Sequence, residues 1–252
     1  MPEIRRIALV TDFGTGSPYV GQMVLRLAQL VPDIQVVDLV SDLPPFRPDL
    51  SAYLLPALVR DVPDDTLFIC VVDPGVGGAR SVIQMEADRR WYIGPDNGLM
   101  SIVARRGRVV RVRRVTWRPS RLSASFHGRD LFCPVGAMLV RGEPLETCAV
   151  GTQAIVGSDW SDDLAKVVYA DGYGNLVCGM RASALSADAR LCAGGRELGY
   201  ARTFCEVPRG AAFWYENSFG LVELAVNQGR ADLMLGLGPG DPIDGLDGIQ
   251  SA

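Results

Sequence analysis

Three loops of this chain combine charged or imidazole side chains with glycine, a pattern typical of small-molecule sites. TDFGTG carries Asp12, VVDPGVGGAR carries Asp73 and Arg80, and SASFHGRD carries His127, the only histidine of the sequence. Asp12 is placed where a carboxylate can accept hydrogen bonds from both hydroxyls of a ribose. Gly128 removes bulk beside the imidazole. These residues are the first candidates for a site.

Each of these candidates also has an ordinary structural explanation. Asp12 suits a turn or a helix cap, and Asp73 with Arg80 suits a structural ion pair. A lone histidine such as His127 is commonly a surface or core residue. The glycine-rich turn after Asp73 leaves backbone amides open to a ligand. No Gly-Lys-Ser/Thr follows it, however, and the strand VIQMEA replaces the expected helix, which argues against a phosphate-binding P-loop.

Polar turns recur later in the sequence. ADGYGNL carries Asp171 and Asn175, and YENSFGLVELA carries Asn217 and Ser218. Both segments are also typical of simple hairpin turns, where asparagine and glycine are common. GPDNGLM is interpreted as a structural turn that leads into a helix.

The apolar pattern predicts the elements that position these loops. IALV, QVVDLV and LFICVV are short apolar runs typical of strands, and apolar residues recur at helical spacing between them. Ser17 and Pro18 suit a helix N-cap and first position, Pro32 marks that helix's end, and a second helix is expected over 48–62. The β-α-β-α-β order predicts a largely parallel sheet, in which ligands bind beyond the carboxyl ends of the strands.

The remaining sequence predicts two regions with different secondary structure. VIQMEA, WYIG and VVRVRRV are expected as strands, with helices at LMSIVARR and RDLFCPVGAMLVRG. From about residue 155, short runs (KVVYADGYGNLVCGM, ARTFCEV, AAFWYEN, LVELAV) alternate with glycine-rich turns and indicate a small all-β domain. The expected limits are an α/β domain over 1–155, a linker over 156–162 and a second domain over 163–252.

Composition and charge limit the kinds of partner that this protein is expected to bind. The 252 residues are 48% hydrophobic and 21% charged, with a net charge of −4, as in an ordinary globular protein. The arginines around VVRVRRV fit a strand with one solvated side better than a nucleic-acid patch. The six cysteines show no metal or redox spacing and are interpreted as buried thiols of a reducing compartment. No signal peptide or membrane span is expected, so a cytoplasmic protein with a small-molecule partner is predicted.

Seven motifs, taken in order, resemble those of the adenosine-forming S-adenosyl-L-methionine (SAM) hydrolase family. They are TDFG with YVG, PPF, VVDPGVGGAR, IGPDNGL, FHGRDLF, DGYGN and NSFGLVELA. The resemblance extends from residue 7 to about residue 240, and DPGVG and FHGRD are far more specific than a lone glycine motif. Fluorinase and chlorinase are halide-using relatives of this family.

The resemblance implies an N-terminal α/β domain and a C-terminal β-barrel-like domain. It also implies a homotrimer in which SAM lies between one subunit's N-domain and its neighbour's C-domain. Neither a metal nor another cofactor is expected.

The family's site maps onto named residues of the N-domain. The resemblance assigns Asp12 to the ribose hydroxyls and Phe46 of PPF to the aromatic side chain beside the ribose. Asp73, Arg80 and His127 fall on the family's water-activating trio.

In the C-domain, Asn175 matches the residue that reads the adenine edge, and Phe204 matches an aromatic that stacks on adenine. Asp171 and Ser218 match positions that hold the methionine ammonium. Ser17 departs from the family pattern, because many members carry an acidic residue there and use it to grip the amino-acid end.

The expected reaction is attack of water on the ribose C5′, which releases adenosine and methionine. Asp73 and His127 accept or orient the water proton, and Arg80 stabilises hydroxide character. The halide-using relatives place tyrosine at Asp73, and fluorinase places threonine at Val76 and serine at Gly128. This chain has the hydrolase set at these positions, and an anionic carboxylate at Asp73 would repel a halide, which argues against a halogenase. The two alternatives to a hydrolase are a halogenase and a non-catalytic SAM- or adenosine-binding protein.

Overall fold

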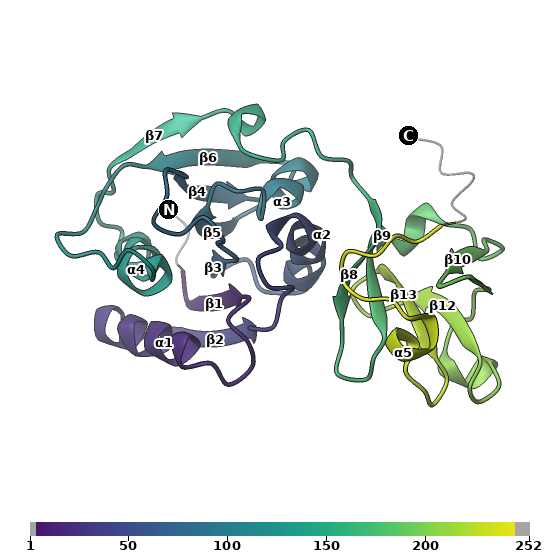
Figure 1. The fold of residues 1–252 in the computed structure, drawn as a ribbon. Coiled ribbons are helices and arrows are strands. Elements are labelled where there is room, and N and C mark those ends of the chain that lie inside the picture. The colour runs from purple at the N-terminus through teal and green to yellow at the C-terminus, as the bar shows by residue number, and fades with distance from the viewer. Residues whose placement is uncertain (1–3, 245–252) are drawn as a thin grey trace. The chain divides into compact units, whose positions relative to one another are not determined.

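The computed structural model describes residues 4–244 of the chain (Figure 1). Within this range, one compact unit contains residues 4–55 and 61–160, and a second contains residues 56–60 and 161–244. The first is a mixed α/β unit with a large, largely parallel sheet, and the second is built on a separate antiparallel sheet. This division into an α/β part and a β-rich part confirms the predicted fold class at that level.

A seven-stranded sheet in the order β2-β1-β3-β5-β4-β6-β7 forms the centre of the first unit. Strands β2, β1, β3 and β5 run parallel, whereas β4, β6 and β7 each pair antiparallel with a neighbour. The bounds are Arg6–Thr11 (β1), Gln35–Val40 (β2), Thr66–Val71 (β3), Val82–Ala87 (β4), Arg90–Pro95 (β5), Val110–Val115 (β6) and Thr147–Val150 (β7). Strand β7 was not expected, because TCAV is too short to show a period.

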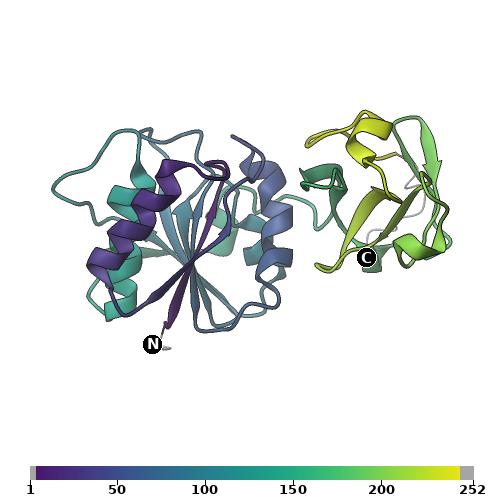
Figure 2. The ribbon, with the colours of Figure 1, turned by 90° about the horizontal axis from the view of Figure 1, so that it is seen from below.

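Helices cover both faces of this sheet. Helices α1 (Pro18–Leu30) and α4 (Cys133–Arg141) lie on one face and α2 (Pro48–Val59) on the other, and α3 spans Ser101–Arg106 (Figures 1 and 2). Helix α1 begins as predicted: Ser17 Oγ accepts a hydrogen bond from the Tyr19 amide at 3.4 Å, and Pro18 follows the cap. Its apolar stripe is buried through Val20, Met23 and Leu27.

The helix expected over 129–142 has two parts. It starts as a π-helical turn, Gly128–Phe132, and continues as α4. Such turns are frequent at functional sites, and this one begins directly after His127. Gly142 ends α4 with a φ of 67°, the left-handed cap that glycine allows.

The second unit contains a four-stranded antiparallel sheet in the order β12-β13-β9-β8. The bounds are Leu164–Ala170 (β8), Leu176–Arg181 (β9), Ala212–Glu216 (β12) and Leu221–Val226 (β13), with a hairpin of Leu191–Ala193 (β10) and Arg196–Leu198 (β11). Three local departures from an all-β domain occur, and the first is a 3₁₀ turn at Ala182–Ala184. ARTFCEV forms a 3₁₀ turn at Phe204–Glu206 instead of a strand, and α5 covers Ala231–Leu235.

The prediction that all six cysteines are buried is wrong. Cys70, Cys133 and Cys178 are buried, but Cys148, Cys192 and Cys205 are exposed, and all six are free thiols. Cys192 lies on β10, where alternation turns the middle side chain outward, and Cys148 lies on β7, the edge strand of its sheet, where the neighbouring Ala149 is exposed as well. Among residues 4–244, no helix has both the length and the apolar character to cross a bilayer.

Candidate active site

Two of the candidate carboxylates lie at the same edge of the parallel sheet. Asp12 directly follows β1 and Asp73 follows β3 by two residues, and Thr11 pairs with Val71 at the ends of these neighbouring strands. The chain leaves β1 toward β2 on one side and reaches β3 on the other. This switch in strand order is where open α/β sheets bind ligands.

Asp73, Arg80 and His127 form one hydrogen-bonded group. Arg80 Nε donates to both carboxylate oxygens of Asp73, at 2.8 and 2.9 Å, and Arg80 Nη2 donates to Asp73 Oδ2. The same Nη2 lies 2.8 Å from His127 Nδ1. The side chains of Asp73 and Arg80 are only 4% and 11% exposed, so this ion pair is held in a low-dielectric environment.

The arginine determines which proton His127 carries. A guanidinium has donors and no acceptor, so Nδ1 of His127 must accept, and the proton of the neutral ring lies on Nε2. Burial lowers the pKa of His127, and the Arg80 charge lowers it further. The imidazole is therefore neutral near pH 7, and its Nε2–H is the group available to a ligand.

Nuclear magnetic resonance can check this tautomer directly, because the protein contains a single histidine. We expect long-range ¹H–¹⁵N spectra to show a protonated Nε2, an unprotonated Nδ1, and a pKa below the ordinary value of about 6.5. As the pH falls through that lowered pKa, the ring gains a proton and loses its bond from Arg80. Arg80→Met should raise the pKa, and a protonated Nδ1 at pH 7 would contradict the assignment.

The trio adjoins a cavity of about 170 Å³ in the first unit. Asp12, Phe46, Asp73 and His127 line it, with Phe13, Val71, Val76, Ser125, Phe126 and Gly128. Asp12 Oδ2 accepts a hydrogen bond from the Phe46 amide at 2.9 Å, and burial raises the pKa of Asp12. Phe46 has a φ of 63° and is 72% exposed. A strained, exposed aromatic beside a half-buried carboxylate is typical of a ligand clamp.

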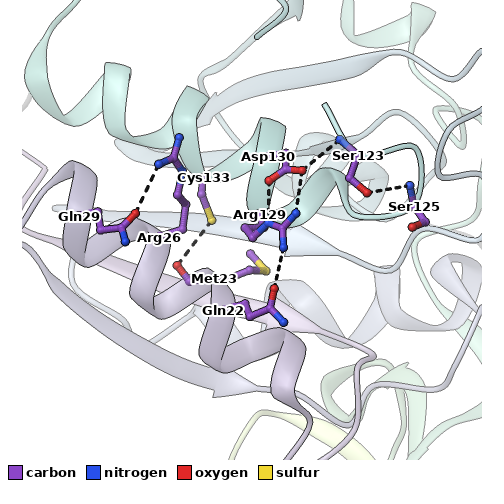
Figure 3. Close-up of polar contacts among 9 residues, drawn as sticks. All are labelled: Gln22, Met23, Arg26, Gln29, Ser123, Ser125, Arg129, Asp130 and Cys133. Carbon is purple, nitrogen blue, oxygen red and sulfur yellow. Dashed lines mark hydrogen bonds and ion pairs between the residues drawn. The ribbon is translucent and has the colours of Figure 1, made fainter. Parts of the chain in front are cut away.

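The loop that carries His127 is held by hydrogen bonds of the two residues Arg129 and Asp130 (Figure 3). Arg129 Nε donates to Asp130 Oδ1 at 2.6 Å, and Asp130 Oδ2 accepts from the Ser123 amide at 3.0 Å. Arg129 Nη1 also donates to Gln22 of α1 at 2.7 Å. The RD pair of FHGRD therefore ties the loop to its own start and to α1, which holds His127 in place.

The glycine-rich turn between Asp73 and Arg80 packs against the loop that precedes His127. Gly77 has a φ of 78°, and a Cβ there would lie 2.5 Å from the Ala124 carbonyl oxygen. Only glycine allows this approach. The backbone contact connects the turn between Asp73 and Arg80 to the loop before His127.

A second cavity, of about 840 Å³, lies in the second unit. Asp171, Asn175, Phe204 and Ser218 line it together with Tyr173, Tyr215, Asn217, Phe219, Glu223, Val226, Gln228, Gly229 and Arg230. Asp171 Oδ1 accepts from the amides of Tyr173 and Asn175, and its Oδ2 accepts from Asn175 Nδ2 at 2.9 Å. Asp171 thus also shapes the β8–β9 turn, as the hairpin interpretation expected.

Sequence reasoning missed a buried polar cluster in this cavity. Glu223 is 6% exposed and accepts hydrogen bonds from Tyr215 Oη and from Asn217 Nδ2. Tyr215 pairs directly with Glu223 across β12 and β13. A glutamate within the apolar run LVELAV was the available signal, since an isolated carboxylate in a buried strand needs partners.

The nine predicted site residues therefore fall into two groups. Asp12, Phe46, Asp73, Arg80 and His127 gather in the first unit, and the other four gather in the second. The first group combines an ion pair, a neutral imidazole and the half-buried carboxylate of Asp12, which suits activation of a small nucleophile. The second combines aromatic and polar side chains, which suits recognition of a ligand that has a flat ring and a polar end.

Ser17 is occupied as the cap of α1, since its Oγ bonds to the Tyr19 amide. Asp96 Oδ1 accepts from the Val156 amide, and Asn97 Nδ2 donates to the Val72 carbonyl at 2.8 Å. GPDNGLM therefore has the structural contacts that its interpretation as a turn expected.

Comparison with known proteins places both units in one family. Residues 7–149 match the SAM hydroxide adenosyltransferase N-terminal domain, and residues 165–244 match the C-terminal domain of the same family. An (R)-S-adenosyl-L-methionine hydrolase of Thermus thermophilus is 35% identical to this chain and aligns over 95% of it and 99% of the relative. A protein of the same name from Salinispora arenicola is 33% identical, over 94% and 96%.

A solved structure agrees with these relatives. The crystal structure of an uncharacterized conserved protein from Thermotoga maritima superposes with a TM-score of 0.83 at 28% identity, covering 94% of this chain and 98% of that one. Sequence and fold agree over nearly the whole length. The chain belongs to the SAM hydroxide adenosyltransferase family.

Proposed function

We propose that this protein hydrolyses SAM to adenosine and L-methionine. The observation that carries the proposal is the buried Asp73–Arg80–His127 group beside Asp12, at the switch point of the parallel sheet. A neutral imidazole and a carboxylate held by one guanidinium are suited to orient and deprotonate water. The hydrolase names of relatives at 33–35% identity support the same reaction.

The geometry supports different roles for the two residues that face the water. Because His127 carries its proton on Nε2, it donates a hydrogen bond to the water oxygen and orients it. Asp73 accepts the water proton, since a carboxylate has about four lone-pair sites and Arg80 occupies three of them at most. Arg80 holds the Asp73 carboxylate through its ion pair and stabilises negative charge on the oxygen.

The bonds balance without another reactant. The water oxygen forms a bond to the ribose C5′ as the C5′–S bond breaks, and the electron pair of that bond stays on sulfur. The sulfonium becomes the neutral thioether of methionine, and the proton moves to Asp73. Alignment of water, carbon and sulfur supplies most of the acceleration, worth up to ~7–11 kcal/mol in well-oriented reactions.

The remaining residues bind the substrate in this account. Asp12 accepts from the ribose hydroxyls and Phe46 packs beside the ribose. In the second unit, Asn175 reads the adenine edge and Phe204 stacks on the ring. Asp171 and Ser218 bind the methionine ammonium, a role that Asp171 combines with its bonds to the β8–β9 turn.

The protein is a homotrimer in the cytoplasm, with each site completed by a neighbouring subunit. The separation of ligand-type residues into two cavities on two units supports a shared site, and three exposed free cysteines suit a reducing compartment.

We also propose that the first domain ends at residue 155, that the second begins at residue 163, and that the strands of the second unit close in a barrel-like manner. Bridges from residues outside the four strands, such as Tyr200 to Trp214 of β12, support the closure.

The test is a product assay. Purified protein incubated with SAM and a chelator is expected to give adenosine and methionine in equal amounts, at a rate that chloride and fluoride leave unchanged. If the protein binds SAM but forms no products, it is a non-catalytic binding protein. A product that forms only with halide would indicate a halogenase. Loss of activity on chelation, restored by a divalent ion, would contradict the metal-independent mechanism.

A further inference from the structure

Glu223 is the most deeply placed carboxylate of the second cavity. It lies on β13, where every residue from Leu221 to Val226 is buried, and the other five are apolar. Its carboxylate accepts from Asn217 Nδ2 at 2.8 Å and from the Tyr215 hydroxyl. Burial of such a group is costly unless it is hydrogen-bonded, and an apolar residue of similar size fills a strand at lower cost. Packing alone therefore does not account for a glutamate here.

One branch of this cluster leads to the β12–β13 turn. Asn217 Oδ1 accepts from the amides of Phe219 and Leu221, both at 3.0 Å, and the Asn217 amide donates to the Leu221 carbonyl at 2.9 Å. Asn217 thus determines the shape of the turn that carries Ser218. Its own side chain is in turn oriented by the bond to Glu223.

The other branch leads to the aromatic side of the cavity. The Tyr215 ring packs against Phe204 with 5.4 Å between ring centroids, and Phe213 contacts both rings. The bond from its hydroxyl to Glu223 fixes how the Tyr215 ring lies under Phe204. A single carboxylate is thus connected to Phe204 and to the turn of Ser218.

We propose that Glu223 is a positioning residue that holds the adenine-stacking wall, through Tyr215, and the turn of Ser218, through Asn217, in one binding geometry. This inference rests on the proposed function, because it takes Phe204 and Ser218 as contacts to the two ends of SAM. Glu223 acts through Tyr215 and Asn217 and does not itself carry out chemistry.

The experiment separates the two branches by ligand. Dissociation constants for adenosine and for SAM are measured in the Asp73→Asn background, so that SAM persists. Tyr215→Phe is expected to weaken both ligands by the same factor, because both contain adenine. Asn217→Ala is expected to weaken SAM more than adenosine, and Glu223→Ala is expected to weaken both, by about tenfold or more, as the loss of a buried hydrogen bond allows.

The conservative variant distinguishes hydrogen bonding from charge. The amide of Glu223→Gln can accept from Asn217 and donate to the Tyr215 hydroxyl, so both affinities should stay within about threefold of the parent. Glu216→Ala, an exposed change on the same hairpin, is the matched control and should alter neither.

Three outcomes would overturn the proposal. In the first, Glu223→Ala lowers only the melting temperature while both affinities stay unchanged. In the second, Glu223→Gln binds as poorly as Glu223→Ala, which would make charge the operative property. In the third, Asn217→Ala weakens adenosine as much as SAM, so that no separate effect on the turn of Ser218 is seen. A parent protein that binds neither adenosine nor SAM overturns the proposed function itself, and this proposal with it.

Discussion

Asp73→Asn is expected to lower kcat for SAM hydrolysis by roughly a hundredfold or more, about 2.7 kcal/mol of activation free energy, with little change in the dissociation constant of SAM. The amide cannot take the water proton, and it presents donors to Arg80 where the carboxylate accepted three bonds. His127→Ala is expected to lose a similar factor, because the water then has no fixed donor. The measurement is single-turnover kinetics beside a binding titration for each variant.

Arg80→Lys is the sharpest variant of this group. Lysine keeps the charge but loses the planar fork that reaches Asp73 and His127 together. We expect a substantial loss of kcat, with His127 released from its bond.

Asp12→Ala serves as the contrasting control. It should chiefly weaken binding, because Asp12 faces the ribose in this account. The catalytic assignment fails if Asp73→Asn and His127→Ala both turn over like the parent protein while binding SAM more weakly. The trio would then be a binding feature.

Mixed assemblies of two inactive variants are expected to recover activity. Asp73→Asn damages the first-unit half of the site, and Asn175→Ala damages the second-unit half. If neighbouring subunits build each site in a closed ring, each trimer that contains both variants has one site with two intact halves, about a third of its sites. The measurement is the activity of co-expressed, differently tagged subunits purified through both tags.

A double variant controls this experiment. Subunits that carry both Asp73→Asn and Asn175→Ala should stay inactive under the same treatment. If each site is instead built within one chain, every chain of the mixture carries a damaged half and no activity returns. A monomer in sedimentation with full activity would also contradict the shared site.

Local patterns were sufficient to predict much of the first unit. Ser17 and Pro18 identified the start of α1, and the apolar runs identified β1, β2 and β3 within one residue at each end. Because parallel strands align their carboxyl ends, the proximity of Asp12 and Asp73 followed from the element order. An ion pair between Asp73 and Arg80 is the structural alternative that the sequence itself suggests for these two residues.

The remaining features depend on contacts between distant segments. The bond from Arg80 to His127 joins residues 47 positions apart and determines the imidazole tautomer. The sequence predicts only that Glu223 lies on a strand, because the pairing of β12 with β13 is what places it opposite Tyr215. The 3₁₀ turn at Phe204 has the composition of a strand, and packing against Phe213 and Tyr215 determines its conformation instead.

Hydrolysis of SAM in ¹⁸O-labelled water tests the central claim most directly, because attack of water on C5′ puts the label in one product only. Mass spectrometry of the two products is the measurement. The account predicts one ¹⁸O atom in the 5′-hydroxyl of adenosine and none in methionine. Unlabelled adenosine, or label in methionine or homoserine, would contradict it.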